Sequence, residues 1–202
     1  MGRLIAAAWL AAAAPAFAQP AALDQIRARL DAHAVVRAEF VQTRTLSALE
    51  RPLVARGQLL VSRADGVVWQ VEKPFRTAYV MQQESVTEIA ADGTRTRREA
   101  RDAPAIARVG RILGALVSAN AAALENQFHI EATVTGDLWQ ILLQPRQAQV
   151  AQRLKAVRVG GGTFVDAVHI DEANGDTTLL QFRNQRSAAT LSEDERRLFA
   201  GG

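Results

Sequence analysis

The sequence contains no cysteine, and this absence excludes several kinds of functional site. Without a thiol the chain cannot form a disulfide, attack a substrate with a thiolate, or bind zinc or an iron–sulfur cluster through cysteine. Long hydrophobic runs are missing as well. No stretch reaches the about 18 consecutive apolar residues that a membrane-spanning helix requires.

A large excess of charge is also absent. The 24 basic and 21 acidic residues give a formal net charge of +3, and both signs occur along the whole chain. Nucleic-acid-binding domains carry clustered positive charge, so we expect no nucleic acid among the partners. The chain does have 202 residues, 49% of them hydrophobic, which is enough for one globular domain with a sizeable core.

The first eighteen residues have the features of a secretory signal peptide. Arg3 precedes an apolar stretch that is too short to span a bilayer, and Ala16-Phe17-Ala18 forms a small-x-small cleavage site. We therefore expect cleavage after Ala18 and a mature domain of residues 19–202 in an exported compartment. The first mature residue is not cysteine, so no lipid anchor is expected there.

The mature chain changes between two periodicities. Leu23, Ile26 and Leu30 recur at helical spacing and predict an amphipathic helix that ends near Ala34. Alternating patterns then predict strands at 35–43, 57–63, 67–72, 76–82, 85–90, 129–135, 138–144, 155–159, 163–171 and 177–183. Between the two groups of strands lie a helix that begins near Pro104 and a short helical piece at 121–127, and a capping box at Ser192 opens a last helix.

This order predicts an α+β fold with one antiparallel sheet. Short turns between neighbouring strands favour a meander, and the helices must pack on a face of the sheet. A single sheet with this many strands coils through its right-handed twist, so we expect it to curve strongly towards a barrel.

Patterns typical of catalysis are absent. The three histidines, His33, His129 and His169, lack the spacing of metal ligands. His169 and Asp171 share one strand face, which favours an exposed pair over an acid–base site. The triplet at 160–162 is rich in glycine but favours a turn or bulge over a phosphate-binding loop. We predict no catalytic residue, no metal and no cofactor, and therefore no enzyme.

A run of basic residues stands between the two groups of strands. It comprises Arg95, Arg97, Arg98 and Arg101. We expect a solvated loop here, and a patch for anionic lipid headgroups is the alternative.

Several segments in the first half of the mature chain share a pattern with a known family. They are Phe40-x-Gln42, Gly57-Gln-Leu-Leu-Val-Ser-Arg63, Trp69 and Lys73-Pro74. In the second half, Pro104, Trp139-x-x-Leu142-x-x-Pro145 and Asp171-x-x-x-Gly175-Asp176-x-Thr178 follow the same family in order and spacing. The chain resembles the periplasmic outer-membrane lipoprotein carriers of the LolA type.

The resemblance implies both a fold and a function. The fold would be an incomplete β-barrel whose concave apolar face is covered by a helical lid. The function would be that of a soluble periplasmic carrier, monomeric and without a cofactor. Such a carrier receives a lipid-modified protein, or another lipid, from an inner-membrane transporter and passes it to an outer-membrane acceptor.

Alternation and the predicted lid helix give candidates for the lipid-binding cavity. They are Phe40, Leu59, Val61, Trp69, Tyr79, Ile106, Val109, Leu113 and Leu116. Each could instead be an ordinary core residue. The resemblance also places Arg63 at the family's arginine, which bonds to the lid and holds the empty cavity shut. An arginine suits this role because its five N–H groups can bond the free carbonyls at a helix end.

The chain departs from the family pattern at three places, the first being the absence of an aromatic pair after Asp92-Gly93. Ala64 replaces the proline that usually follows the arginine, and the segment 192–199 replaces the usual extended tail. These departures indicate a divergent member and leave the identity of the cargo open. Two alternatives to a carrier remain: a non-transporting periplasmic module that senses lipid or stabilises an envelope complex, and an envelope hydrolase.

Overall fold

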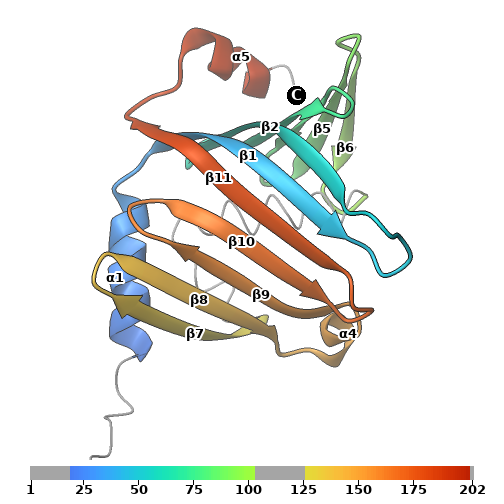
Figure 1. Ribbon diagram of the computed structural model, residues 1–202. Coiled ribbons are helices and arrows are strands. Elements are labelled where there is room, and N and C mark those ends of the chain that lie inside the picture. Colours follow the sequence, from blue (N-terminus) through green and yellow to red (C-terminus); the bar gives the residue numbers. More distant parts are fainter. Residues whose placement is uncertain (1–18, 103–125, 201–202) are drawn as a thin grey trace, which may run out of the picture.

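The computed structural model describes residues 19–102 and 126–200, and eleven strands of these ranges form one antiparallel sheet (Figure 1). The strands are β1 (Val35–Thr45), β2 (Leu53–Ser62), β3 (Gly66–Lys73), β4 (Thr77–Met81), β5 (Ser85–Ala90), β6 (Arg95–Glu99), β7 (Phe128–Thr135), β8 (Leu138–Pro145), β9 (Leu154–Gly161), β10 (Val165–Glu172) and β11 (Thr177–Ala188). The helices are α1 (Gln19–Asp31), α4 (Ala148–Ala151) and α5 (Glu193–Ala200). None of the helices in these ranges is long and apolar enough to cross a membrane.

The sheet consists of two meanders, β1–β6 (the front meander) and β7–β11 (the rear meander). They are joined by the pairing of β1 with β11. The strand order is β6-β5-β4-β3-β2-β1-β11-β10-β9-β8-β7, so β1 and β11 lie side by side at the centre. Phe40 of β1 faces Phe182 of β11, and the register shifts between Arg37 and Glu39. Strands β6 and β7 form the two edges, and the sheet remains an open, strongly curved half-barrel.

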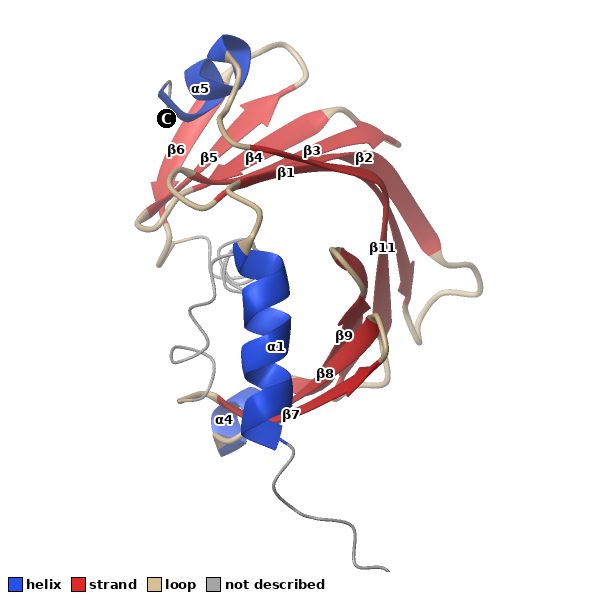
Figure 2. Cartoon of the chain, turned by 90° about the vertical axis from the view of Figure 1, so that its left-hand side faces the viewer, coloured by secondary structure: helices blue, strands red, loops and turns tan. Residues whose placement is uncertain are grey.

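The concave face of the sheet carries the main hydrophobic core. Helix α1 crosses the open side of the half-barrel (Figure 2). Its buried side chains, Ala22, Ile26 and Leu30, pack into the core cluster formed by the inward residues of both meanders. The spacing of these three residues is helical, so burial of this one face explains why the segment folds as a helix.

The convex face carries a smaller core under α5. Leu191 and Phe199 of the C-terminal segment pack on Val35, Leu60 and Val80. This cover explains why four consecutive residues of β2, from Leu59 to Ser62, are all buried. Strands covered on one face alternate, whereas strands covered on both faces do not.

The structure confirms the predicted fold class and ten of the strands, and it corrects one element. The basic run is not a loop: Arg95–Glu99 is strand β6, paired with β5. All five residues of β6 are exposed. The strand could not be found from alternation because no face of it is buried. The helix predicted to begin near Pro104, with nearly all of the following helical piece, lies outside the described residues.

Candidate functional site

The centre of the concave face is built from aromatic and aliphatic side chains of adjacent strands. Phe40 is 1% exposed and stacks on Trp69, with ring centroids 3.9 Å apart and an interplanar angle of 29°. Gly57 lies opposite Phe40 on β2. A Cβ atom at Gly57 would lie 1.8 Å from the carbonyl oxygen of Gln70 and 3.0 Å from the Phe40 ring, so only glycine fits under this stack.

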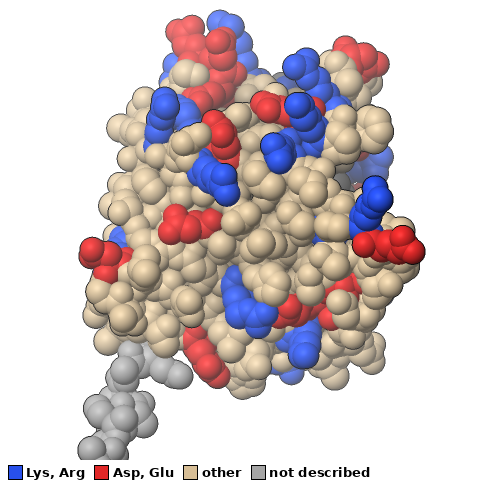
Figure 3. Space-filling view, in the orientation of Figure 1, with Lys and Arg blue, Asp and Glu red and all other residues tan. Residues whose placement is uncertain are grey.

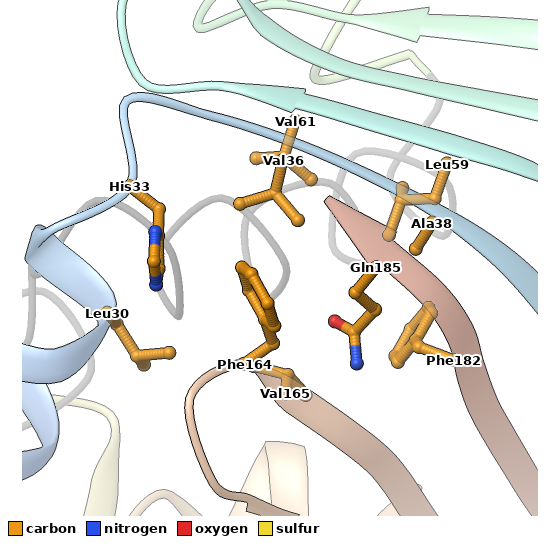
Figure 4. A pocket seen from close by; sticks show the side chains of 10 residues that line it. All are labelled: Leu30, His33, Val36, Ala38, Leu59, Val61, Phe164, Val165, Phe182 and Gln185. Carbon is orange, nitrogen blue, oxygen red and sulfur yellow. The ribbon is translucent and has the colours of Figure 1, made fainter. Parts of the chain in front are cut away.

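A small pocket opens where the end of α1 meets the junction of the two meanders. Its volume is about 30 Å³. The lining residues are Leu30, His33, Val36, Ala38, Leu59, Val61, Phe164, Val165, Phe182 and Gln185. Figure 4 shows Phe164 standing between His33 on one side and Gln185 with Phe182 on the other. The His33 and Phe164 rings are 4.5 Å apart between centroids, so they narrow the pocket from the α1 side.

This pocket is small. A volume of about 30 Å³ holds about two water molecules. Sites for small-molecule ligands usually measure roughly 300–1,000 Å³.

Arg63 connects the front meander to the C-terminal end of α1. Its Nη2 donates to the carboxylate of Asp31 at 2.6 Å and to the carbonyl oxygen of Leu30 at 3.2 Å. The Arg63 backbone N–H donates to the carbonyl of Ala34 at 3.1 Å. The last carbonyls of a helix have no partner within the helix and carry partial negative charge, so a guanidinium is a favourable partner.

Arg29 connects α1 to the rear meander. Its guanidinium donates to the carbonyl oxygens of Asp137 at 2.7 Å and Gly136 at 3.1 Å, both in the turn between β7 and β8. Helix α1 is thus tied to the front meander through Arg63 and to the rear meander through Arg29. These polar contacts surround the apolar face that α1 buries.

Comparison with known proteins identifies the family. The family described as outer membrane lipoprotein carrier protein LolA-like matches residues 12–197. The chain belongs to the LolA-like family. No curated protein matches the sequence.

Several solved structures are similar to this LolA-like chain at low sequence identity. A LolA superfamily protein from Nitrosomonas europaea gives a TM-score of 0.47 at 8% identity, covering 88% of this chain and 97% of its own. MucB in the Pseudomonas aeruginosa MucA/MucB complex gives 0.46 at 10% identity, covering 85% and 58%. The Mycobacterium tuberculosis lipoprotein LppX gives 0.40 at 13% identity, covering 86% and 99%.

The structure brings together the predicted cavity residues that it describes. Phe40, Leu59, Val61, Trp69 and Tyr79 all belong to the core cluster of the concave face, and Tyr79 is only partly buried. Leu59 and Val61 also line the pocket. The four residues predicted on the lid, Ile106, Val109, Leu113 and Leu116, lie outside the described residues. The lipid-binding role of all nine stays a prediction.

Sequence reasoning missed most of the pocket lining. Val36 and Ala38 could have been found from the sequence, because they are spaced two residues apart from each other and from Phe40 on β1 and therefore share its face. Phe164 and Gln185 could not. Phe164 lies in the turn between β9 and β10, and Gln185 lies within the register shift of β11, so only the folded sheet brings them into the pocket.

The pair His169 and Asp171 lies on the convex side of the sheet, but it is half-buried rather than exposed, with side chains 35% and 19% exposed. Arg158 on the neighbouring strand contacts both, with its Nη2 2.7 Å from the Asp171 carboxylate and 2.7 Å from Nδ1 of His169. The guanidinium therefore occupies the side of the imidazole that faces the carboxylate. Among the described residues, no group of three or more histidine or acidic side chains could hold a metal ion.

Proposed function

We propose that this LolA-like protein carries acyl chains on the concave apolar face of its half-barrel. The observation that carries the proposal is a continuous apolar face, contributed by both meanders, that α1 covers without closing the sheet. An acyl chain exposed to water costs about 0.8 kcal/mol for each CH₂ group, so a two- or three-chain lipid needs a protein that covers it.

The contacts of α1 suggest how the carrier opens. Ala22, Ile26 and Leu30 occupy the space that acyl chains would take, and an entering chain replaces this apolar contact with a similar one. The bonds of Arg63 and Arg29 then break without replacement. Loading is therefore favourable through apolar contact and is weakened by the lost polar bonds, which helps the cargo to leave.

Membership of the LolA-like family supports the route that we propose. In this proposal residues 1–18 direct export and are removed after Ala18, and the mature domain acts in the periplasm as a monomer. An inner-membrane transporter is the donor and an outer-membrane site is the acceptor. The cargo is a lipid-modified protein or another lipid with two or three acyl chains. No step requires a cofactor, and the protein acts by binding rather than by catalysis.

Extraction of bound lipid tests the proposal. Protein purified without detergent is extracted, and the extract is analysed by mass spectrometry together with uptake of a fluorescent diacyl lipid. We expect diacyl or triacyl lipid in the extract and saturable uptake by the protein. An extract without lipid, combined with no uptake, would contradict the carrier and favour the non-transporting module.

Two matched variants locate the binding face. Tyr79 is half-buried on the concave face, and Ile89 on the adjacent strand is half-buried on the convex face. We expect Tyr79→Asp to lower lipid uptake about tenfold or more, because a carboxylate would have to be buried beside the acyl chain. Ile89→Asp carries the same change on the other side of the sheet and should leave uptake unchanged. Equal losses in both variants would place the lipid elsewhere.

A further inference from the structure

One corner of the sheet exposes large apolar side chains, which we call the apolar tip. It consists of Leu49, Leu53, Val54 and Phe75, which are 47%, 50%, 45% and 81% exposed. Leu138, at 64%, is the other large hydrophobic side chain exposed in the described ranges. Single exposed apolar residues are normal, whereas a cluster of them marks an interaction surface.

The strand register brings the tip residues together. Arg56 of β2 lies opposite Lys73 of β3. Val54 and Phe75 each lie two residues beyond this pair, so both lie at the same end of the strands. The connection between β1 and β2, which holds Leu49, projects from that end of the strands at the right of Figure 1.

The projecting connection is held in a fixed shape. The backbone N–H and the hydroxyl of Ser47 both donate to one carboxylate oxygen of Asp176, at 2.8 and 2.9 Å, which anchors the connection to the turn between β10 and β11. These bonds lower the pKa of Asp176, so the carboxylate remains an acceptor at neutral pH. The Leu49 N–H donates to the carbonyl of Leu46 at 3.0 Å. These hydrogen bonds therefore hold the connection in a conformation in which the Leu49 side chain is exposed.

Basic side chains surround the apolar tip, and we call them the basic collar. They are Arg51, Arg56, Lys73 and Arg76. All four are exposed, and none of them forms an ion pair with another described residue. Three carboxylates lie near the collar, those of Glu50, Glu72 and Asp176, against four basic groups, so the local excess of positive charge is one. Figure 3 shows charges of both signs over the whole visible face, including the right-hand end where the connection between β1 and β2 projects.

We infer that the apolar tip inserts into the interface of an anionic membrane while the basic collar contacts the lipid headgroups. Apolar insertion and electrostatic attraction are each weak, and together they give reversible membrane binding. A projecting tip with side chains from two separate connections suits a lipid surface, which adapts to any convex shape. The inference goes beyond the proposed function, because the tip lies outside the concave core and does not require that a lipid be carried there.

Co-sedimentation with vesicles tests the inference. The purified protein is mixed with phosphatidylcholine vesicles with and without phosphatidylglycerol, and the bound fraction is measured. We expect binding only to vesicles that contain phosphatidylglycerol, and weaker binding as salt increases. Phe75→Ser should lower the partition coefficient about tenfold. Lys73→Gln and Arg76→Gln should each lower it about fivefold.

Leu138→Ser is the matched control. Leu138 is also an exposed apolar residue, but it begins β8 at the opposite end of the strands from the apolar tip. We expect its variant to bind vesicles as the parent does. The parent protein and all variants have the same N-terminal residues, so any vesicle binding by those residues is the same in each and does not affect the comparison. Equal binding by the Phe75→Ser and Leu138→Ser variants would overturn the inference. So would failure of the parent protein to bind phosphatidylglycerol vesicles, which would leave the tip as a surface for a protein partner.

A second readout separates this inference from the carrier proposal. Phe75→Trp introduces an exposed indole, whose emission should shift to shorter wavelength and resist acrylamide quenching when anionic vesicles are added. The parent protein, measured in the same way, gives the background of the native tryptophans. Phe75→Ser should leave uptake of diacyl lipid unchanged, because the cavity is intact. An emission from the Phe75→Trp variant that does not respond to vesicles would overturn tip insertion while leaving the carrier proposal standing.

Discussion

At the scale of single residues, Arg63 is, with Arg29, one of the side chains that bond α1 to the sheet. Its guanidinium bonds Leu30 and Asp31 at the end of the helix and is 30% exposed. We predict that Arg63→Leu still takes up lipid but delivers it less well to acceptor membranes. Loss of the bonds destabilises the closed state by about 1 kcal/mol, so the loaded state is retained about fivefold longer. Transfer between donor and acceptor vesicles measures the effect.

The control for this prediction is an arginine without a link to α1. Arg183 is exposed on β11, and Arg183→Leu should transfer lipid as the parent does. Arg63→Lys should give an intermediate rate, since an ammonium group keeps the charge but reaches fewer acceptors. If Arg63→Leu delivers lipid at the parental rate, Arg63 has no role in holding the cavity shut.

At the scale of elements, an ion pair joins α5 to the convex face in addition to the apolar contacts of Leu191 and Phe199. Arg37 of β1 donates two hydrogen bonds to the Glu195 carboxylate, at 2.5 and 2.6 Å. The same carboxylate accepts the N–H of Ser192, as the predicted capping box requires. The Arg37 hydrogen bonds, assisted by Ser192, lower the pKa of Glu195 to about 2.

This depressed pKa predicts how stability depends on pH. The folded carboxyl titrates at about 2 and the unfolded one near 4.5, so the ion pair contributes fully above about pH 5. The contribution is lost as pH falls from about 5 to 2. We expect Glu195→Gln to lower the free energy of unfolding at pH 7 by about 1–2 kcal/mol and to flatten its dependence on pH in that range. Urea unfolding measures both effects.

Glu193→Gln on the same helix is the control. Its side chain is 78% exposed and contacts only Arg197, at 3.7 Å, so the stability of this variant should match that of the parent at every pH. A Glu195→Gln variant that keeps the parental acid profile would show that other carboxyl groups cause the loss of stability.

Elements with one buried face could be predicted from the sequence, and those without one could not. The predicted bounds of strand β5 agree with the observed ones, and its first three residues are buried. Strand β6 was missed, since both of its faces are exposed. The first residues of β2, from Leu53 onward, are exposed as well, so alternation does not predict them as part of the strand. They form part of the apolar tip. The bonds between Arg29 and the turn after β7 join residues more than a hundred positions apart, which no local pattern can show.

At the scale of the whole molecule, the curved sheet and α1 behave as a framework and a cover. The sheet is continuous from β6 to β7, so its curvature is fixed by strand pairing along its whole width. Helix α1 has no strand partner. Its position depends on three buried side chains, on the bonds of Arg29 and Arg63, and on contacts with β7. The cover can therefore be displaced at far lower cost than the framework can be opened.

This difference predicts the effect of lipid on hydrogen exchange. A pocket of about 30 Å³ has to enlarge when acyl chains enter, and displacement of α1 exposes its backbone amides. We expect loading with a diacyl lipid to accelerate exchange at 22–30 while the amides of β1 and β11 stay protected. Helix α5 provides the internal control, because it packs on the convex face and should exchange equally in both states. Unchanged or slower exchange in α1 would mean that another part of the cover moves, and that Arg29 and Arg63 fix a permanent wall of the cavity.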